Sequence, residues 1–226
     1  MTDYTAILKE NAEKDYAEFG KKLLPDTNYP ILGVRIPTIR KIALSAIKNG
    51  DYTPPKTFKY YEECMLCGLF TALNKEDFDV KVKSLDKYLE YVDSWGLTDS
   101  VAAAFKSAEK NTLKTENFVY NLLDSAKTYK VRFAIVILTL HFCGEKFKKE
   151  YLDAVLKVKY GNYYVDMAIA WYVSVLIVKN RDVGVKLIES FTLPEFIHNK
   201  SIQKAVESFR VSDADKTYLK SLKIKK

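Results

Sequence analysis

A short segment of this chain recurs at an interval of about one helix pair. Tyr129-Lys-Val-Arg-Phe-Ala-Ile135 matches Tyr163-Tyr-Val-Asp-Met-Ala-Ile169 in its Tyr, Val, Ala and Ile positions, at an offset of 34 residues. The same frame recurs 37 residues later at Ile202–Val206 and, more loosely, 33 residues earlier at Thr98–Ala102. Helix pairs that repeat at this interval stack into superhelices. The repeat therefore predicts an all-α fold, an α-solenoid of antiparallel helix pairs, curved with a concave binding face.

Helical periodicity continues along the rest of the chain, and no segment alternates with period two for long enough to predict a strand. Pro37 near the start of one helix and Gly50 after its end fit the usual asymmetry of helix termini. The sequence predicts one helical-repeat domain over residues 1–226, in which 213–226 form a short basic tail. The expected helices span about 2–24, 37–49, 58–74, 78–91, 94–110, 115–126, 129–143, 149–159, 163–179, 183–191 and 201–209.

The charge balance of the chain permits a polyanionic partner. Lys and Arg number 36 against 29 Asp and Glu, which gives a net charge of +7 and a pI of about 9.0. Such an excess fits nucleic-acid binding, and it also fits an ordinary solvated surface. The segment after Met1 is polar, and no apolar run reaches the roughly 18 residues that a membrane span requires. We expect a cytoplasmic protein without a membrane partner.

The cysteines favour a reducing compartment. Cys64, Cys67 and Cys143 are an odd number, and disulfides are rare in the cytosol. Cys64-Met-Leu-Cys67 has the spacing of a metal or redox pair, but it lies in an apolar helical pattern without a second pair of ligands. We therefore interpret it as core packing, and the sequence predicts no metal and no cofactor.

The repeat register aligns one polar position across four repeats. Asp99, Arg132, Asp166 and Gln203 are equivalent residues in four successive repeats. One interpretation is an inter-repeat ladder in which Arg132 pairs with Asp99 and Asp166. The other is a functional site, which we favour for Asp99 and Arg132 because a tryptophan lies close to the column in sequence. Asp166 is assigned equally to the rim of the site or to the ladder.

Trp95-Gly-Leu-Thr-Asp99 is the stretch that points most directly to chemistry. A spacing of four residues places Trp95 and Asp99 on one helix face, one turn apart. Asp is a poor residue for a helix interior. A carboxylate beside an indole suits the binding of a cation or an electron-poor ring.

Four stretches of the chain together resemble the DNA alkylation-repair glycosylases of the AlkD type, which are built from HEAT-like repeats. The segment 29–42, Tyr-Pro-Ile-Leu-Gly-Val-Arg-Ile-Pro-Thr-Ile-Arg-Lys-Ile, is similar to the N-terminal Leu-Gly-(Ile/Val)-x-x-Pro-x-x-Arg signature of that family. Trp95-x-x-x-Asp99 is similar to its active-site helix. Arg132 before an Ala-Ile run, and Trp171 after Ala168-Ile-Ala, match its later Arg and Trp positions in order and in approximate spacing.

The resemblance implies a monofunctional glycosylase that excises cationic N3- and N7-alkylpurines from double-stranded DNA without flipping the base into a pocket. It implies that Asp99 is the catalytic carboxylate, that Trp95 and Trp171 cradle the deoxyribose of the lesion, and that Arg132 holds the DNA backbone. A cationic base is already a good leaving group. The enzyme then has to stabilise an oxocarbenium-like sugar and position water, which a carboxylate can do.

Three residues depart from the family pattern. Leu24 stands where an aromatic residue is often found, Ser174 where active relatives commonly carry Arg, and Asp166 where some relatives carry an amide. These positions bear on substrate range and on activity. A non-catalytic helical-repeat module that binds damaged or branched DNA, or another polyanion, is therefore the alternative, and a protein-binding solenoid is a third possibility.

Basic residues near two expected helix starts form the predicted DNA-binding surface. Helix N-termini and basic side chains on one face can follow a phosphate backbone, although scattered surface charge would give the same composition. We expect a monomer that binds alkylated duplex DNA through Arg132 and through a set of further residues: Arg35, Arg40, Lys41, Lys127 and Lys130.

Overall fold

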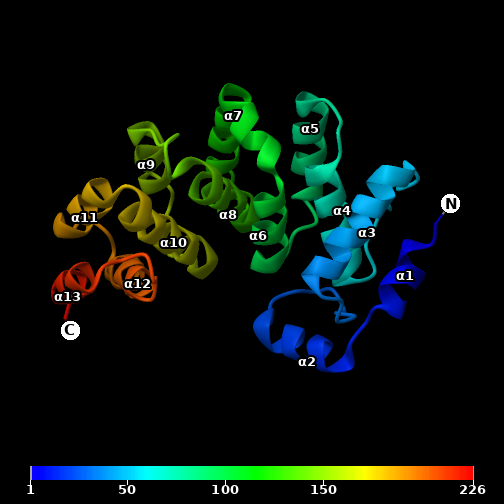
Figure 1. Ribbon diagram of the computed structural model, residues 1–226, viewed down its shortest axis with the longest axis horizontal. Helices are drawn as coiled ribbons and strands as arrows, with labels where there is room; N and C mark the ends of the chain where they lie inside the picture. Colours follow the sequence, from blue (N-terminus) through cyan, green and yellow to red (C-terminus); the bar gives the residue numbers. More distant parts are fainter. Residues whose placement is uncertain (1, 226) are drawn as a thin grey trace. The chain divides into compact units, whose positions relative to one another are not determined.

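The computed structural model describes residues 2–225, in which every regular element is a helix and there is no β-strand (Figure 1). This confirms the all-α fold. The described helices are α1 Tyr4–Glu10, α2 Lys14–Leu23, α3 Ile36–Asn49, α4 Tyr61–Leu73, α5 Phe78–Tyr88, α6 Trp95–Ala104, α7 Thr112–Leu123, α8 Thr128–Ile137, α9 Lys149–Leu156, α10 Tyr163–Lys179, α11 Arg181–Glu189, α12 Glu195–Val206 and α13 Asp213–Ser221, with a 3₁₀ turn at Lys106–Lys110 and a π turn at Leu138–Phe142.

The chain divides into two compact units, Met1–Lys114 and Thr115–Lys226, called here the N-terminal and C-terminal units. In the N-terminal unit, α4 is the central helix and contacts α1, α3, α5 and α6. It is apolar on nearly every side, and its buried residues include Cys64 and Cys67. Both thiols are free, and burial raises the pKa of Cys67 to about 11. Core packing of the Cys-x-x-Cys pair is therefore confirmed.

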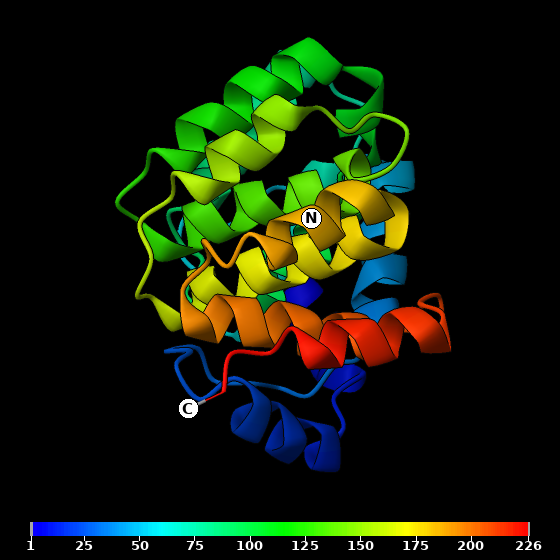
Figure 2. The same cartoon turned by 90° about the vertical axis from the view of Figure 1, so that its left-hand side faces the viewer.

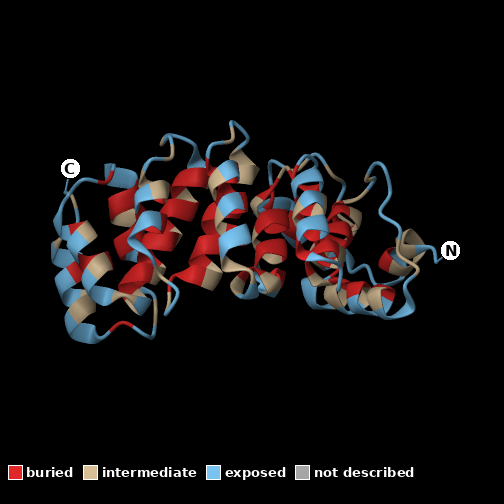
Figure 3. Ribbon diagram, turned by 90° about the horizontal axis from the view of Figure 1, so that it is seen from above, coloured by how far each residue is buried: buried red, intermediate tan, exposed pale blue. Residues whose placement is uncertain are grey.

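In the C-terminal unit, α10 is the central helix, and it packs against α8, α11 and α12. Figure 2 shows α10 and α12 side by side, in yellow and orange. Buried residues lie where the helices of a unit face one another (Figure 3). This packing of successive helices is the arrangement expected of a solenoid. Although α10 is strongly apolar, no helix in the described part of the chain is long and apolar enough to cross a membrane.

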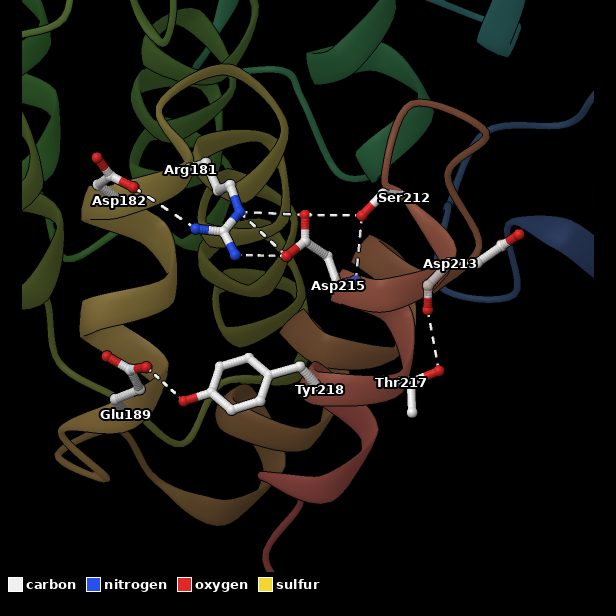
Figure 4. Close-up of polar contacts among 8 residues, drawn as sticks. All are labelled: Arg181, Asp182, Glu189, Ser212, Asp213, Asp215, Thr217 and Tyr218. Carbon is white, nitrogen blue, oxygen red and sulfur yellow. Dashed lines mark hydrogen bonds and ion pairs between the residues drawn. The ribbon is translucent and has the colours of Figure 1, made fainter.

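Residues 213–221 form α13, where the sequence suggested only a basic tail. Ser212 caps the helix by accepting the Asp215 N–H. Both oxygens of Asp215 also share the Arg181 Nε–H, at 3.0 and 3.1 Å, and the Tyr218 hydroxyl donates to Glu189 (Figure 4). The tail prediction missed these contacts because they join α13 to α11, which is distant in sequence.

Three expected helices are interrupted in the structure. The helix expected over 2–24 is two helices, because the Glu13 N–H between them donates to the Gly33 carbonyl, 3.0 Å away, and not within a helix. The helix expected over 94–110 ends at Ala104 and continues as the 3₁₀ turn. The one expected over 129–143 becomes the π turn after Ile137. Helical periodicity in sequence does not distinguish these continuations from a regular α-helix.

Candidate functional site

Trp95 and Asp99 lie one turn apart on α6, and both side chains are partly exposed. The Thr98 side chain between them is fully buried. Its hydroxyl oxygen lies 2.8 Å from Asp99 Oδ1 and 2.8 Å from the Trp95 carbonyl oxygen. The two acceptors share the single proton of this buried hydroxyl, and the contact restricts the rotamers of Asp99. The first two turns of α6 therefore present a positioned carboxylate beside an indole.

The end of α2 supports the first turn of α6, which contains Trp95 and Gly96. The Trp95 indole N–H points at the Leu23 carbonyl oxygen, 3.4 Å away. Leu24 packs against Gly96, where an added Cβ would lie 3.3 Å from a Leu24 methyl carbon and only 2.4 Å from the Tyr61 hydroxyl. Gly96 thus permits the close approach of α2 and α4 to α6. Leu24, one of the departures from the family pattern, is a buried packing residue.

Asp93 attaches the loop after α2 to the start of α6. Its carboxylate accepts hydrogen bonds from the Thr27 hydroxyl at 2.9 Å and from the Asn28 N–H at 2.7 Å. The Tyr29 hydroxyl donates to the Tyr91 carbonyl at 3.0 Å. These bonds hold the loop beside the residues that lead into Trp95.

Glu62 explains the Leu-Gly signature. Its carboxylate is 1% exposed and accepts the N–H groups of Leu32, Gly33 and Val34 at 2.9, 2.8 and 3.2 Å. Gly33 has a φ of +94°, and an added Cβ would lie 2.2 Å from the Glu13 carbonyl oxygen. The signature therefore holds the α2–α3 connection against α4. The sequence analysis missed Glu62 and Asp93, because sequence alone does not distinguish a buried, hydrogen-bonded acidic residue near a helix start from an ordinary solvent-exposed one.

The C-terminal unit holds Arg132 and Asp166, which are equivalent residues in two repeats. Arg132 is 6% exposed, and its Nη1 donates to the Tyr164 carbonyl at 2.7 Å. Asp166 is 9% exposed and accepts the Gly161 N–H with both oxygens, at 3.1 and 3.2 Å. Burial is the main cause that raises the pKa of Asp166.

No ion pair joins Arg132 to Asp166 in the described part of the chain. The ladder interpretation is wrong for this pair, because Asp166 turns back to the residues that precede its own helix. Gln203, the next equivalent residue, is exposed; it accepts from Lys200 and donates to Glu207. Asp166 and Gln203 therefore bind to nearby backbone and to their own helix, respectively.

Trp171 lies on α10, partly exposed, and lines a groove of about 310 Å³ between α10 and the end of α12. The Ser174 hydroxyl donates to the Trp171 carbonyl at 2.7 Å. Because serine is neutral, this residue adds no charge to the groove. Lys204 and Arg210, which also line the groove, bring basic side chains from another part of the chain. The missing Arg at position 174 thus leaves a surface that still contains cationic groups beside the indole.

The basic residues predicted to bind DNA differ in their surroundings. Arg35 is exposed but forms a bidentate ion pair with Glu13, with N–O distances of 2.8 and 2.9 Å, and its guanidinium lies over the Tyr16 ring. Arg40 and Lys41 lie on α3, partly exposed and exposed respectively. In the C-terminal unit, Lys127 precedes α8 and is exposed, and Lys130 lies in its first turn and is partly exposed. The positive charge of Arg35 is therefore compensated locally.

Comparison with known proteins gives one family. A search of curated proteins finds no match to this chain. A family model described as DNA alkylation repair enzyme matches residues 2–174, from the start of the N-terminal unit through Trp171 and Ser174 on α10. This range contains the Leu-Gly signature, the α6 pair and Arg132, and it covers most of the chain. The chain therefore belongs to the DNA alkylation repair enzyme family.

Proposed function

We propose that this member of a DNA alkylation repair family is a monofunctional DNA glycosylase. It hydrolyses the N-glycosidic bond of N3- and N7-alkylated purines in duplex DNA, without flipping the damaged base. The observation that carries this proposal is the start of α6, where the partly exposed carboxylate of Asp99 lies one turn after the Trp95 indole and is hydrogen-bonded by Thr98.

The proposed chemistry requires little acid catalysis. An alkylated purine with a fixed positive charge leaves readily, so the barrier lies in the developing charge on the sugar. Asp99 stabilises the oxocarbenium-like sugar electrostatically and positions the attacking water. The indole face of Trp95 favours cationic character near it, by about 0.5–2 kcal/mol. Neutral lesions, whose bases leave poorly, are then weak substrates.

The proposed DNA contacts come from both units. Trp171 offers a second indole to the deoxyribose, in a groove that also contains Lys204 and Arg210. Lys41, Lys127, Lys130 and the partly exposed Arg40 follow the phosphates. Arg35 contributes less, because Glu13 already neutralises it. A direct contact of Arg132 with the DNA backbone stays a prediction, and its burial argues for a supporting role behind Tyr164.

Release of free bases tests the proposal. Purified protein is incubated with methylated duplex DNA, and 7-methylguanine and 3-methyladenine are measured in the supernatant by chromatography. We expect release of both bases and none from unmethylated DNA. If the protein binds the methylated duplex but releases neither base, the catalytic proposal is wrong, and the non-catalytic DNA-binding module becomes the better account. Ser174, where active relatives commonly carry Arg, is the residue that favours that alternative.

A further inference from the structure

Four aromatic rings form a continuous row across three helices of the C-terminal unit. Tyr129 of α8 lies 5.7 Å from Tyr164 of α10 between ring centroids, and Tyr164 lies 5.3 Å from its neighbour Tyr163. Tyr163 in turn lies 6.0 Å from Phe196 of α12. We call these residues the aromatic row. Its members come from three successive repeats, so the packing of the helices brings them together.

The aromatic row lies at the N-termini of its helices. Each ring belongs to the first or second residue of α8, α10 or α12, which contain 10, 17 and 12 residues. The Asn162 amide donates to the Thr128 hydroxyl at 3.0 Å and thereby joins the starts of α8 and α10. Backbone N–H groups at a helix start carry partial positive charge. The row is thus anchored to regular helices in an electropositive setting.

Two rings of the row are open to solvent. The Tyr163 residue is 59% exposed and the Phe196 residue 41% exposed. The two rings are tilted by 48°, so each can receive a flat ligand on its own face. Neighbouring exposed aromatic rings are unfavourable in water, and they commonly mark a binding surface.

Lysines outnumber acidic residues in the segments that contain the aromatic row and the loops before it. The segments 125–130, 157–164 and 192–200 hold five lysines and one acidic residue, Glu195, while Asp124 and the nearly buried Asp166 lie just outside them. Lys200 lies one turn after Phe196 on α12 and is partly exposed. Aromatic faces beside lysines suit a ligand that carries both flat rings and negative charge.

We propose that the aromatic row is a stacking platform for the unpaired bases of single-stranded DNA. The bases lie against Tyr163 and Phe196, and the lysines neutralise the strand's phosphates, which is how sequence-independent single-strand binding works. This inference goes beyond excision from duplex DNA, where the bases are already stacked. It also goes beyond the family match, because that match ends at residue 174 and Phe196 lies outside it.

Binding of two short strands tests the platform. Fluorescence anisotropy is measured with labelled oligothymidylate and with an abasic strand of equal length, which keeps the phosphates but has no bases. We expect the protein to bind oligothymidylate about tenfold more tightly than the abasic strand, since base–aromatic stacking contributes on that scale. The double variant Tyr163→Ala with Phe196→Ala should lose this preference and bind both strands equally.

Matched variants separate stacking from general effects. Phe209→Ala removes a fully exposed ring outside the row and should leave the preference intact. Tyr163→Trp should keep it, and Tyr163→Leu, which is apolar but has no aromatic face, should weaken it. Circular dichroism confirms that each variant is folded. Equal affinity of the unmodified protein for the two strands would overturn the proposal. An unchanged preference for oligothymidylate in the double variant would also overturn it. If the double variant in addition lost self-association of the protein, the aromatic row would be a protein–protein contact.

This test is independent of excision. A protein that releases no methylated base, but that prefers oligothymidylate through the aromatic row, would refute the glycosylase proposal and leave the platform standing. A protein that excises methylated bases but shows no preference for oligothymidylate would support the glycosylase proposal and overturn the stacking platform.

Discussion

At the scale of single residues, Asp166 and Arg132 show how equivalent repeat positions acquire different roles. Both are nearly buried, yet Asp166 is bound by the Gly161 N–H and Arg132 binds the Tyr164 carbonyl. A carboxylate that loses solvent without gaining a cation is held at a cost in free energy. For Asp166 that cost appears as a raised pKa, which burial causes.

The raised pKa of Asp166 predicts a specific pH dependence of stability. As pH rises from the ordinary aspartate value to the raised folded value, the unfolded chain loses its proton first, so the folded protein loses stability. Asn cannot ionise. We therefore expect the unfolding free energy of Asp166→Asn, relative to the unmodified protein, to increase between about pH 4 and about pH 7. Urea unfolding at both pH values measures it, and a difference that falls with pH would show that Asp166 is stabilised as a carboxylate.

Replacement of Arg132 distinguishes a supporting residue from a DNA contact. Arg132→Ala removes a buried charged donor from the Tyr164 carbonyl, and we expect a loss of about 1.5–3 kcal/mol in unfolding free energy. Lys41→Ala, on an exposed site, should change it by less than about 0.5 kcal/mol. Unchanged thermal melting of Arg132→Ala together with weaker DNA binding would instead assign Arg132 to the DNA interface.

The sequence identified the α6 pair because a spacing of four residues on a helix is a local property. It did not identify Glu62 or Asp93, whose partners are 28 to 66 residues away. Nor did it separate the environments of Asp99, Arg132 and Asp166, since burial depends on neighbouring helices. The aromatic row was missed for the same reason: its rings are adjacent only after three repeats have packed.

At the scale of elements, the helices were more predictable than the connections between them. The start of α10 at Tyr163 and its end at Lys179 agree with the pattern in sequence, because this helix has a capping Asn162 and an apolar run. The break between α2 and α1 depends on a backbone bond to Gly33, from another part of the chain. Helix ends that are fixed by such contacts carry little signal in local sequence.

Gly33 and Gly50 differ in how closely other atoms surround them. Gly33 and Gly50 both have positive φ, +94° and +67°, but an added Cβ meets backbone atoms at Gly33 and nothing within 4 Å at Gly50. We expect Gly50→Ala to cost about 1 kcal/mol of stability and Gly33→Ala more than about 3 kcal/mol. Chemical denaturation of both variants measures the difference. Equal costs would mean that the α2–α3 connection moves freely away from Glu13.

At the scale of the whole molecule, a net charge of +7 and membership of a DNA alkylation repair family point to a polyanionic partner. The basic side chains lie on both units. Binding to duplex DNA is expected to weaken with salt, and the logarithm of the association constant should fall with a slope of about −0.9 for each phosphate contact. Titrations between low and moderate salt measure that slope. Affinity that is insensitive to salt would argue against phosphate contacts and against the role of Lys41, Lys127 and Lys130.

The central claim is that the charge of Asp99, and not its shape, drives excision. Asp99→Asn keeps the size of the side chain, so this variant should fold and bind methylated duplex DNA like the unmodified protein. Asp153→Asn, on the exposed side of α9, is the matched control. Trp95→Ala and Trp171→Ala should each cost less than the loss of the carboxylate, since a single indole contributes about 1–2 kcal/mol.

Single-turnover release of 7-methylguanine by Asp99→Asn is the most direct measurement. We predict a rate lower by ~10²-fold or more, the scale on which a preorganised electrostatic group acts, with Asp153→Asn unchanged. Release by Asp99→Asn at the unmodified rate would contradict the mechanism, and Asp99 would then be a residue of the helix surface and not a catalytic group.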